Sequence, residues 1–186
     1  MRVVAGSAKG VRLAPVPEGV RPVSDRAREG LFSSLGARVP GARVLDLFAG
    51  TGALGIEALS RGAAHAVFVE RAPAAAAALY ENLELARVAE HATVAPRAVL
   101  SFLKDADAAA VGGPFDLVFL DPPYEVGSPD LDEILRRTGE GALLSEGWTV
   151  MLTRDKKSST YVIPVHWAVA RELRYGDSLL TLFVEV

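Results

Sequence analysis

The chain has 186 residues and a mass of 19.7 kDa, which suffices for one ordinary domain with a short appendage but not for two full domains. Half of the residues are hydrophobic and 23% are charged, so the chain can bury a core and is not a disordered tail. Its formal net charge of −3, taken over the whole chain, argues against a nucleic-acid binder, whose expected surface is basic. The absence of cysteine excludes disulfides, thiolate metal sites and a cysteine nucleophile.

The N-terminus lacks the apolar stretch of a signal peptide, and no run of residues approaches the length of a membrane span. We therefore expect a cytoplasmic protein that does not associate with membranes. A single Asn (Asn82), no Gln, and sixteen Arg against four Lys are typical of a thermophile. A GC-rich genome would produce the same excess of arginine.

The first two expected elements are a short arm and a helix. Residues 2–5 and 10–14 are β-prone runs on either side of a glycine-containing turn, which predicts a hairpin or an extended arm. Ser24 is a good N-cap for a helix over residues 25–36. Asp25 would lie in the first turn of this helix, where the helix dipole favours a negative charge.

Strands and helices then alternate along the chain. Apolar β-prone runs predict strands at residues 44–48, 66–70, 92–95, 115–120 and 148–152, with helices between them at 54–61, from Pro73 onward, at 98–103 and at 130–138. Gly176 and Asp177 form a two-residue hairpin turn between the last two runs, 167–175 and 179–186. The pattern predicts an α/β fold with a doubly wound, mostly parallel, Rossmann-like sheet of about seven strands that ends in an antiparallel hairpin.

A glycine-rich turn follows the first of these strands. Gly50, Gly52 and Gly55 have the G-x-G-x-x-G spacing between a strand and a helix, the context that gives this motif its meaning. The helix N-terminus offers unpaired N–H groups beside the turn. Glu70 ends the next strand, where a carboxylate can accept hydrogen bonds from ribose hydroxyls. The pattern predicts a site for a ribose-containing cofactor, and the alternative is a strand-to-helix turn without a ligand.

Asp46 favours one class of cofactor over another. It ends the strand four residues before Gly50 and directs a carboxylate into the glycine-rich turn. That charge would repel the pyrophosphate of a dinucleotide but would attract the ammonium group of an amino-acid moiety. S-adenosylmethionine carries an ammonium group and no phosphate, so Asp46 favours this methyl donor.

The tetrapeptide 121–124, Asp-Pro-Pro-Tyr, follows the strand at 115–120 directly, at the edge of the sheet where ligands of such folds bind. Two prolines would hold the Asp121 carboxylate and the Pro122 carbonyl in fixed directions, and Tyr124 would supply a flat face. Two acceptors beside an aromatic plane suit the exocyclic amino group of a stacked base. They would localise the nitrogen lone pair toward the methyl group in the transition state. The alternative is a rigid turn without a catalytic role.

The missing cysteine also limits the chemistry. Methylation at C5 of a pyrimidine generally uses a cysteine nucleophile, and this chain has none. Methylation of an amino group does not need one, so it remains compatible with the sequence.

Three segments together resemble a known family: residues 21–32 (RPVSDRAREGLF), 46–61 (DLFAGTGALGIEALSR) and 121–124 (DPPY). The chain resembles the RsmD-type methyltransferases over nearly its whole length, and the run at 21–32 narrows the likeness to that family. The resemblance implies transfer of a methyl group from S-adenosylmethionine to the N2 amino group of a guanine in bacterial 16S rRNA, at position 966. The product would be S-adenosylhomocysteine, and the substrate would be 16S rRNA, free or within an assembled small ribosomal subunit. We expect a monomer that holds no metal.

The resemblance also implies roles for particular residues. The cofactor site would comprise Asp46, Phe48, Gly50, Gly52, Glu70 and Arg71, with Asp46 near the amino-acid end of the cofactor. The catalytic corner would comprise Asp121, Pro122 and Tyr124. The residue that contacts adenine after the third strand is often acidic in related enzymes. Here residues 95–98 read APRA, so this contact would come from backbone or from Arg97.

Basic residues are concentrated at the start of the chain. Residues 1–38 hold seven Lys or Arg and three Asp or Glu, a net charge of +4, whereas the rest holds 13 and 20, a net charge of −7. We therefore predict a basic arm, residues 1–23, that docks RNA phosphates, followed by a methyltransferase domain, residues 24–186. The side chains expected to contact RNA are Lys9, Arg12, Arg21 and Arg26. The alternative is a solvated basic face.

Other functions stay open at this point. The same chemistry on another amino group would methylate N6 of adenine in DNA or RNA, or a glutamine amide in a protein. The small size argues against a reader of DNA sequence, and a protein-amide methyltransferase more often has Asn in place of Asp121. A nicotinamide dehydrogenase would accept the glycine spacing but leaves Asp46 and residues 121–124 unexplained. A non-catalytic cofactor-binding regulator would bind the ligand without turnover.

Overall fold

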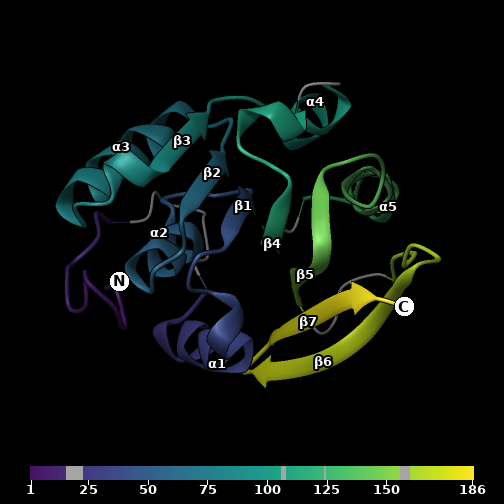
Figure 1. Cartoon of the computed structure of the whole chain (residues 1–186), viewed down its shortest axis with the longest axis horizontal. Helices are drawn as coiled ribbons and strands as arrows, with labels where there is room; N and C mark the ends of the chain where they lie inside the picture. The colour runs from purple at the N-terminus through teal and green to yellow at the C-terminus, as the bar shows by residue number, and fades with distance from the viewer. Residues whose placement is uncertain (16–22, 106–107, 124, 156–159) are drawn as a thin grey trace.

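The computed structural model describes residues 1–15, 23–105, 108–123, 125–155 and 160–186. Within these residues, seven strands form one sheet in the order β3-β2-β1-β4-β5-β7-β6 (Figure 1). The strands are β1 (Arg43–Leu47), β2 (His65–Val69), β3 (Ala92–Ala95), β4 (Phe115–Leu120), β5 (Leu144–Asp155), β6 (Trp167–Tyr175) and β7 (Ser178–Glu185). β1 to β5 pair in parallel, whereas β7 pairs antiparallel with both β5 and β6. The predicted fold class is confirmed.

Helices cover both faces of the sheet, so the protein has two cores. α1 (Asp25–Leu35), α2 (Ala53–Ser60) and α3 (Pro73–Leu85) pack on one face, and α4 (Val99–Lys104) and α5 (Ser128–Thr138) pack on the other (Figure 1). Short 3-10 turns lie at Gly36–Arg38, Ala89–His91 and Ala108–Val111. Among the residues described, no helix is long and apolar enough to cross a membrane.

Strand β1 illustrates why the central strands are apolar. Val44 packs into the core under α1 to α3, whereas Leu45 and Leu47 pack into the core under α4 and α5, and all three side chains are fully buried. A strand that is covered on both faces has no solvent-facing position for a polar residue. Asp46 is the exception in this strand, and it is buried as well. A buried carboxylate in such a position needs a reason other than packing.

The local signals in the sequence correspond to the observed element ends. Ser24 caps α1 by accepting a hydrogen bond from the Ala27 N–H at 3.2 Å, and Pro73 begins α3. Tyr175 pairs with Ser178 across the predicted two-residue turn. The strand predicted at 148–152 is longer in the structure, because β5 pairs with β7 as far as Asp155. The polar residues at both ends of β5 conceal this length in the sequence.

The N-terminal arm is docked on the helices rather than free. Arg2 and Arg12 form one antiparallel bridge, which agrees with the predicted hairpin. The buried Glu57 carboxylate of α2 accepts hydrogen bonds from the N–H groups of Val4 at 2.7 Å and Ala5 at 3.0 Å. Three apolar side chains of the arm, Val3, Ala8 and Leu13, are buried against the domain.

The structure changes the charge count of the first 38 residues. Arg28 is fully buried, and its guanidinium donates hydrogen bonds to the Arg2 carbonyl and to Asp25, both at 2.6 Å. Arg38 donates to the Gly147 carbonyl and to the Thr149 hydroxyl. Arg28 is therefore inaccessible to RNA, whereas Arg38 stays exposed although its guanidinium is bonded to β5.

Candidate active site

Glu70, which follows β2, is bonded to Gly50 in the glycine-rich turn that follows β1. We call Asp46, this turn and Glu70 the cradle. One oxygen of the Glu70 carboxylate accepts the Gly50 N–H at 2.8 Å, and the other accepts the Ala72 N–H at 2.7 Å. Each carboxylate oxygen has two lone pairs, so both oxygens retain capacity for a further donor. Glu70 thus orders the glycine-rich turn and can still accept a hydrogen bond from a ligand hydroxyl.

The glycines of the turn are required for different reasons. Gly50 has a left-handed φ of 56°, and a Cβ added there would meet no atom within 4 Å, so open space lies beside it. Gly52 also has a left-handed φ, of 84°, but a Cβ there would clash with Leu79 of α3. A Cβ on Gly55 would clash with Phe68 of β2. Gly50 therefore borders the space for a ligand, whereas the other two permit close packing.

Phe48 has an unusual backbone conformation beside the turn. Its φ is 65°, in the left-handed region that costs a non-glycine residue about 1–3 kcal/mol. Hydrogen bonds on either side hold this conformation: the Ala49 N–H donates to the Val69 carbonyl at 3.0 Å, and the Gly52 N–H donates to the Ala49 carbonyl at 2.8 Å. Strain of this kind gathers at functional sites. Its presence next to Gly50 supports a functional role for this turn.

Asp46 is a buried carboxylate in an unfavourable electrostatic environment. One of its oxygens accepts the Gly55 N–H at 2.9 Å, near the start of α2. Burial raises the pKa of Asp46 to about 8, the charges of Asp121 and Glu70 add to this effect, and the Gly55 hydrogen bond opposes it. Three carboxylates thus lie close enough to influence one another. A bound cation would relieve their repulsion.

The Asp-Pro-Pro corner lies at the carboxyl end of β4. Pro122 is buried, and the Pro123 carbonyl accepts the Val126 N–H at 3.1 Å, which closes the turn before α5. Burial raises the pKa of Asp121 to about 7, and a hydrogen bond from the Thr153 hydroxyl opposes the shift. Tyr124 lies outside the described residues, so its predicted stacking role stays a prediction.

Thr153 is a site residue that the sequence analysis missed. β5 is parallel to β4 with Leu120 opposite Leu152, so the next residue of each strand, Asp121 and Thr153, meet at the same edge of the sheet. The Thr153 side chain is buried. This contact depends on the relative register of β4 and β5, and no local sequence motif indicates that register.

Two arginines near the cradle behave differently. Arg71 follows Glu70 and is exposed, so it is accessible to a ligand. Arg97 pairs with Asp105 at 2.9 Å, and its guanidinium lies 5.2 Å from the centre of the Phe102 ring. The Arg97 side chain is thus held along α4 by these two partners. An adenine contact from the Arg97 side chain would require it to leave these partners. A contact from the backbone that follows β3 would not.

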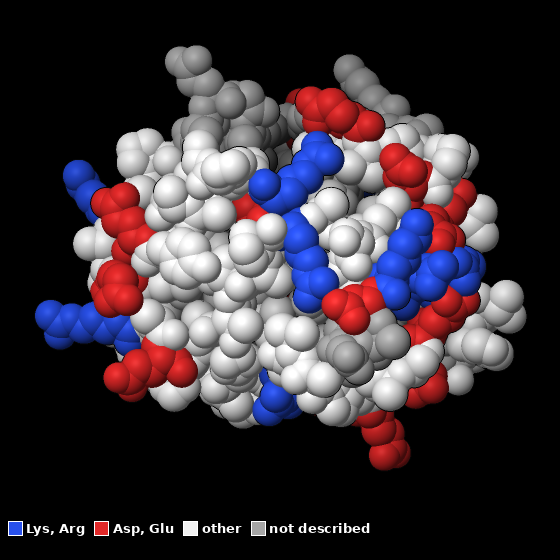
Figure 2. All heavy atoms as spheres, turned by 90° about the horizontal axis from the view of Figure 1, so that it is seen from above, with Lys and Arg blue, Asp and Glu red and all other residues white. Residues whose placement is uncertain are grey.

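Three of the four residues predicted to contact RNA are exposed. Lys9 lies in the turn of the arm, Arg12 follows in its second run, and Arg26 lies in the first turn of α1. Arg21 lies outside the described residues. Figure 2 shows basic and acidic side chains interspersed on one face of the molecule, so no broad field of one sign covers that face. Any contact with RNA phosphates would therefore be made by a few localised side chains.

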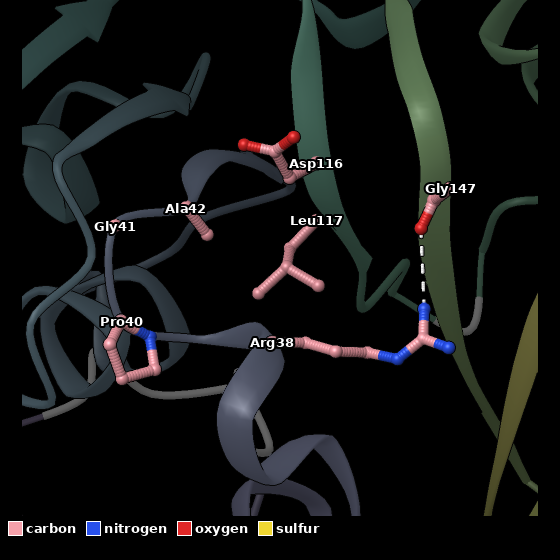
Figure 3. A pocket seen from close by; sticks show the side chains of 7 residues that line it. All are labelled: Arg38, Pro40, Gly41, Ala42, Asp116, Leu117 and Gly147. Atoms are coloured by element: carbon pink, nitrogen blue, oxygen red, sulfur yellow. Dashed lines mark hydrogen bonds between the residues drawn. The ribbon is translucent and has the colours of Figure 1, made fainter.

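Two surface pockets among the described residues lie away from the cradle. One, of about 340 Å³, is lined by residues at the amino ends of β1 and β4, including Asp116 and Ala42, with Arg38 bonded to the Gly147 carbonyl beside it (Figure 3). The other, of about 590 Å³, lies between α5 and residues 162–167. Ligands of doubly wound sheets bind at the carboxyl ends of the strands. The candidate active site is therefore the cradle and the corner of residues 121–123.

The fold and the cradle define a chain of the Rossmann-like methyltransferase class. Among solved structures, the Escherichia coli protein yhhF has a TM-score of 0.86 and 32% identity, with 100% of this chain and 97% of that chain covered. SMU.776, solved in complex with S-adenosylhomocysteine, has a TM-score of 0.69 over 90% of this chain and 50% of that chain. At 18% identity this second likeness concerns the fold alone.

The chain belongs to the family described as Conserved hypothetical protein 95, which matches residues 1–184. It is also 35% identical over 185 residues to "Ribosomal RNA small subunit methyltransferase D" of Escherichia coli (strain K12), covering 98% of this chain and 89% of that protein. The resemblance to the RsmD-type methyltransferases is confirmed.

Proposed function

We propose that this protein transfers a methyl group from S-adenosylmethionine to the exocyclic N2 amino group of a guanine in small-subunit ribosomal RNA. The family membership supports ribosomal RNA of the small subunit as the substrate, because this is the substrate in the name of the E. coli relative. The position of the guanine, 966, is part of the proposal and rests on the family resemblance.

The observation that carries the proposal is the grouping of Asp46, Glu70 and Asp121 at one edge of the sheet. Asp46 lies one residue before the end of β1, and Glu70 and Asp121 directly follow β2 and β4. The charges of Glu70 and Asp121 both raise the pKa of Asp46. Open space lies beside Gly50, at the same edge. This donor set fits a cofactor with an ammonium and a sulfonium group. Asp46 would hold the ammonium group and Glu70 the ribose hydroxyls.

The chain's residues would act on the amino group by orienting it. When bound, the cofactor supplies a methyl group made electrophilic by its sulfonium. Asp121 and the Pro122 carbonyl would accept the two N–H groups of the guanine amine and hold its nitrogen in line with the methyl carbon and the sulfur. In that arrangement the N–C bond would form as the C–S bond breaks, with the electron pair of the C–S bond left on sulfur and one amino proton released to solvent.

We also propose that residues 1–23, together with the start of α1, contact RNA. Lys9, Arg12 and Arg26 are exposed, and the arm is anchored to the domain through Glu57. An anchored arm can position its cations relative to the active site. Phosphate contacts of this kind orient the RNA without reading its sequence.

A single labelling experiment tests the proposal. The protein is incubated with labelled S-adenosylmethionine and, in separate reactions, with free 16S rRNA, small ribosomal subunits, DNA and total protein, and the modified nucleoside or residue is identified. We expect N2-methylguanosine from one or both RNA samples. Label only in DNA or in protein would overturn the assignment, as would N6-methyladenosine. The comparison of free RNA with subunits identifies the form of the substrate.

A further inference from the structure

Asn82 connects the N-terminal arm with the glycine-rich turn, two segments to which the proposed function gives separate roles. It lies in α3 and is fully buried. Its side-chain oxygen accepts the N–H of Ala14, at the end of the N-terminal arm, at 2.6 Å. Its side-chain nitrogen donates to the carbonyl of Thr51 at 2.8 Å. A backbone N–H can only donate and a carbonyl can only accept, so these two partners determine the orientation of the amide.

Thr51 is the middle residue of the glycine-rich turn, between Gly50 and Gly52. Glycine populates left-handed and right-handed backbone conformations about equally, so two glycines in succession around Thr51 do not specify the shape of the turn. Outside contacts have to supply that specification. Glu70 holds the Gly50 N–H from the side of β2, and Asn82 holds the Thr51 carbonyl from the side of α3.

The same helix supports the turn at a second point. Leu79, one helical turn before Asn82, lies where a Cβ of Gly52 would be. α3 therefore backs the turn with an apolar contact and a buried hydrogen bond. Loss of the Asn82 amide would leave the Thr51 carbonyl and the Ala14 N–H without these partners in the protein interior, which favours local rearrangement of the turn.

We propose that Asn82 is a positioning residue that holds the glycine-rich turn in the shape required for cofactor binding, and that the docked arm completes this support through Ala14. The inference rests on the proposed function, because it takes this turn as the cofactor site. Asn82 itself touches neither cofactor nor RNA in this arrangement. It acts through the Thr51 carbonyl, and its own orientation depends on the arm.

Ser60 provides a matched control on a neighbouring helix. It is buried, and its hydroxyl accepts the Ala8 N–H at 2.9 Å and donates to the Ala5 carbonyl at 2.6 Å. It thus makes two hydrogen bonds to the arm, as many as Asn82 makes in total, but none to the turn. Ser60→Ala tests the general cost of loosening the arm, whereas Asn82→Leu tests that cost together with the release of the turn.

The test measures binding of S-adenosylhomocysteine to the RNA-free protein by calorimetry. It also measures hydrogen exchange of the Gly50 and Gly52 amides without ligand by NMR. We expect Asn82→Leu to weaken binding about tenfold, equivalent to one buried hydrogen bond, and to speed exchange of both amides. Ser60→Ala should change binding by less than about twofold and leave both amides protected. Equal effects of the two variants, or no effect of Asn82→Leu, would overturn the proposal.

A second variant covers the case in which Asn82→Leu does not fold. Asn82→Asp retains the acceptor for Ala14; its carboxyl can donate to the Thr51 carbonyl when protonated but not when ionised. Because burial raises the pKa of a carboxyl, the variant is measured from about pH 6 to about pH 10 beside the wild-type protein. Its turn amides should lose protection relative to the wild-type protein as the pH rises, and protection equal to that of the wild-type protein at every pH would refute the role. If the wild-type protein binds no S-adenosylhomocysteine, the proposed function fails, and amide exchange still tests the positioning role separately.

Discussion

Substitution of Thr153 by Val should change the pH dependence of methyl transfer without changing the residues that contact substrate. Burial raises the pKa of Asp121 to about 7, and this value already includes the opposing effect of a hydrogen bond from the Thr153 hydroxyl. The hydroxyl also lies 3.2 Å from the Met151 sulfur, but it has one proton, and an ionised carboxylate is a stronger acceptor than a thioether. Valine has nearly the same shape as threonine and cannot donate that proton.

The size of the effect follows from the strength of the lost hydrogen bond. A hydrogen bond to a charged group contributes about 1.5–3 kcal/mol, and one pKa unit corresponds to about 1.4 kcal/mol. Loss of the Thr153 donor should therefore raise the pKa of Asp121 by roughly one to two units. At pH 7 the ionised fraction would fall from about one half to between about a tenth and a hundredth. If the ionised carboxylate is the acceptor for the amine, the rate at pH 7 falls by up to about fiftyfold, and by less where the bound cofactor lowers the pKa of Asp121.

The assay is single-turnover methyl transfer measured from pH 6 to about pH 9, at saturating cofactor and RNA. In the wild-type protein the rate should rise with a midpoint at or below the Asp121 pKa of about 7, because the bound cofactor stabilises the ionised carboxylate, and in Thr153→Val the midpoint should move to higher pH. Thr149→Val is the matched control, because Thr149 is a buried threonine of the same strand that bonds Arg38 instead. An unchanged midpoint in Thr153→Val, or an equal shift in Thr149→Val, would refute the argument.

Three further predictions concern the carboxylates and the arm. Asp121→Ala should abolish turnover and leave the Kd for S-adenosylhomocysteine, which lacks the sulfonium charge, within about twofold; a large loss of binding of this ligand would mean that the role of Asp121 is misassigned. Cofactor binding at pH 7 should release up to about one proton, because Asp46, with a pKa raised to about 8, is mostly protonated before an ammonium group binds. Calorimetry in buffers of different ionisation enthalpy measures this release, and Asp46→Asn should remove most of it and leave the smaller contribution of Asp121. The double substitution Lys9→Ala and Arg12→Ala should weaken RNA binding and reduce the magnitude of the slope of log K against log salt concentration by about 1.5 to 2. An unchanged slope would mean that these side chains are solvated and do not contact RNA phosphates.

Much of the fold could be predicted because the sheet is covered on both faces. Strand β4 has the bounds that its apolar run predicts, since a doubly covered strand has few polar positions to obscure the pattern. The cradle could be located for a related reason. A glycine-rich turn and a carboxylate at the next strand end lie at the same edge of a parallel sheet, whatever the details of packing.

The missed residues have roles that depend on contacts between distant segments. Thr153 meets Asp121 only through the register of β4 and β5. Asn82, as a polar residue within a helix, gives no local signal that it reaches the arm and the turn. Phe48 is predicted as a cofactor-site residue, but its left-handed backbone is not, because the sequence favours that conformation mainly for glycine or asparagine. Burial of Arg28 likewise depends on the arm folding back over α1.

The carboxylates of the cradle also discriminate between the two cofactor classes that a G-x-G-x-x-G turn permits. A pyrophosphate beside Gly50 would add negative charge next to Glu70, whose charge already raises the pKa of Asp46. The cost of ionising Asp46 and Asp121 would then rise further, and both would be driven toward their protonated forms. A ligand with ammonium and sulfonium groups has the opposite effect, because each positive charge stabilises an ionised carboxylate. Cofactor binding would thus lower the pKa of Asp121 and increase the ionised fraction of this carboxylate, which is the form that accepts the hydrogen bond of the amine. Only a cationic ligand in the cradle has this effect on Asp121.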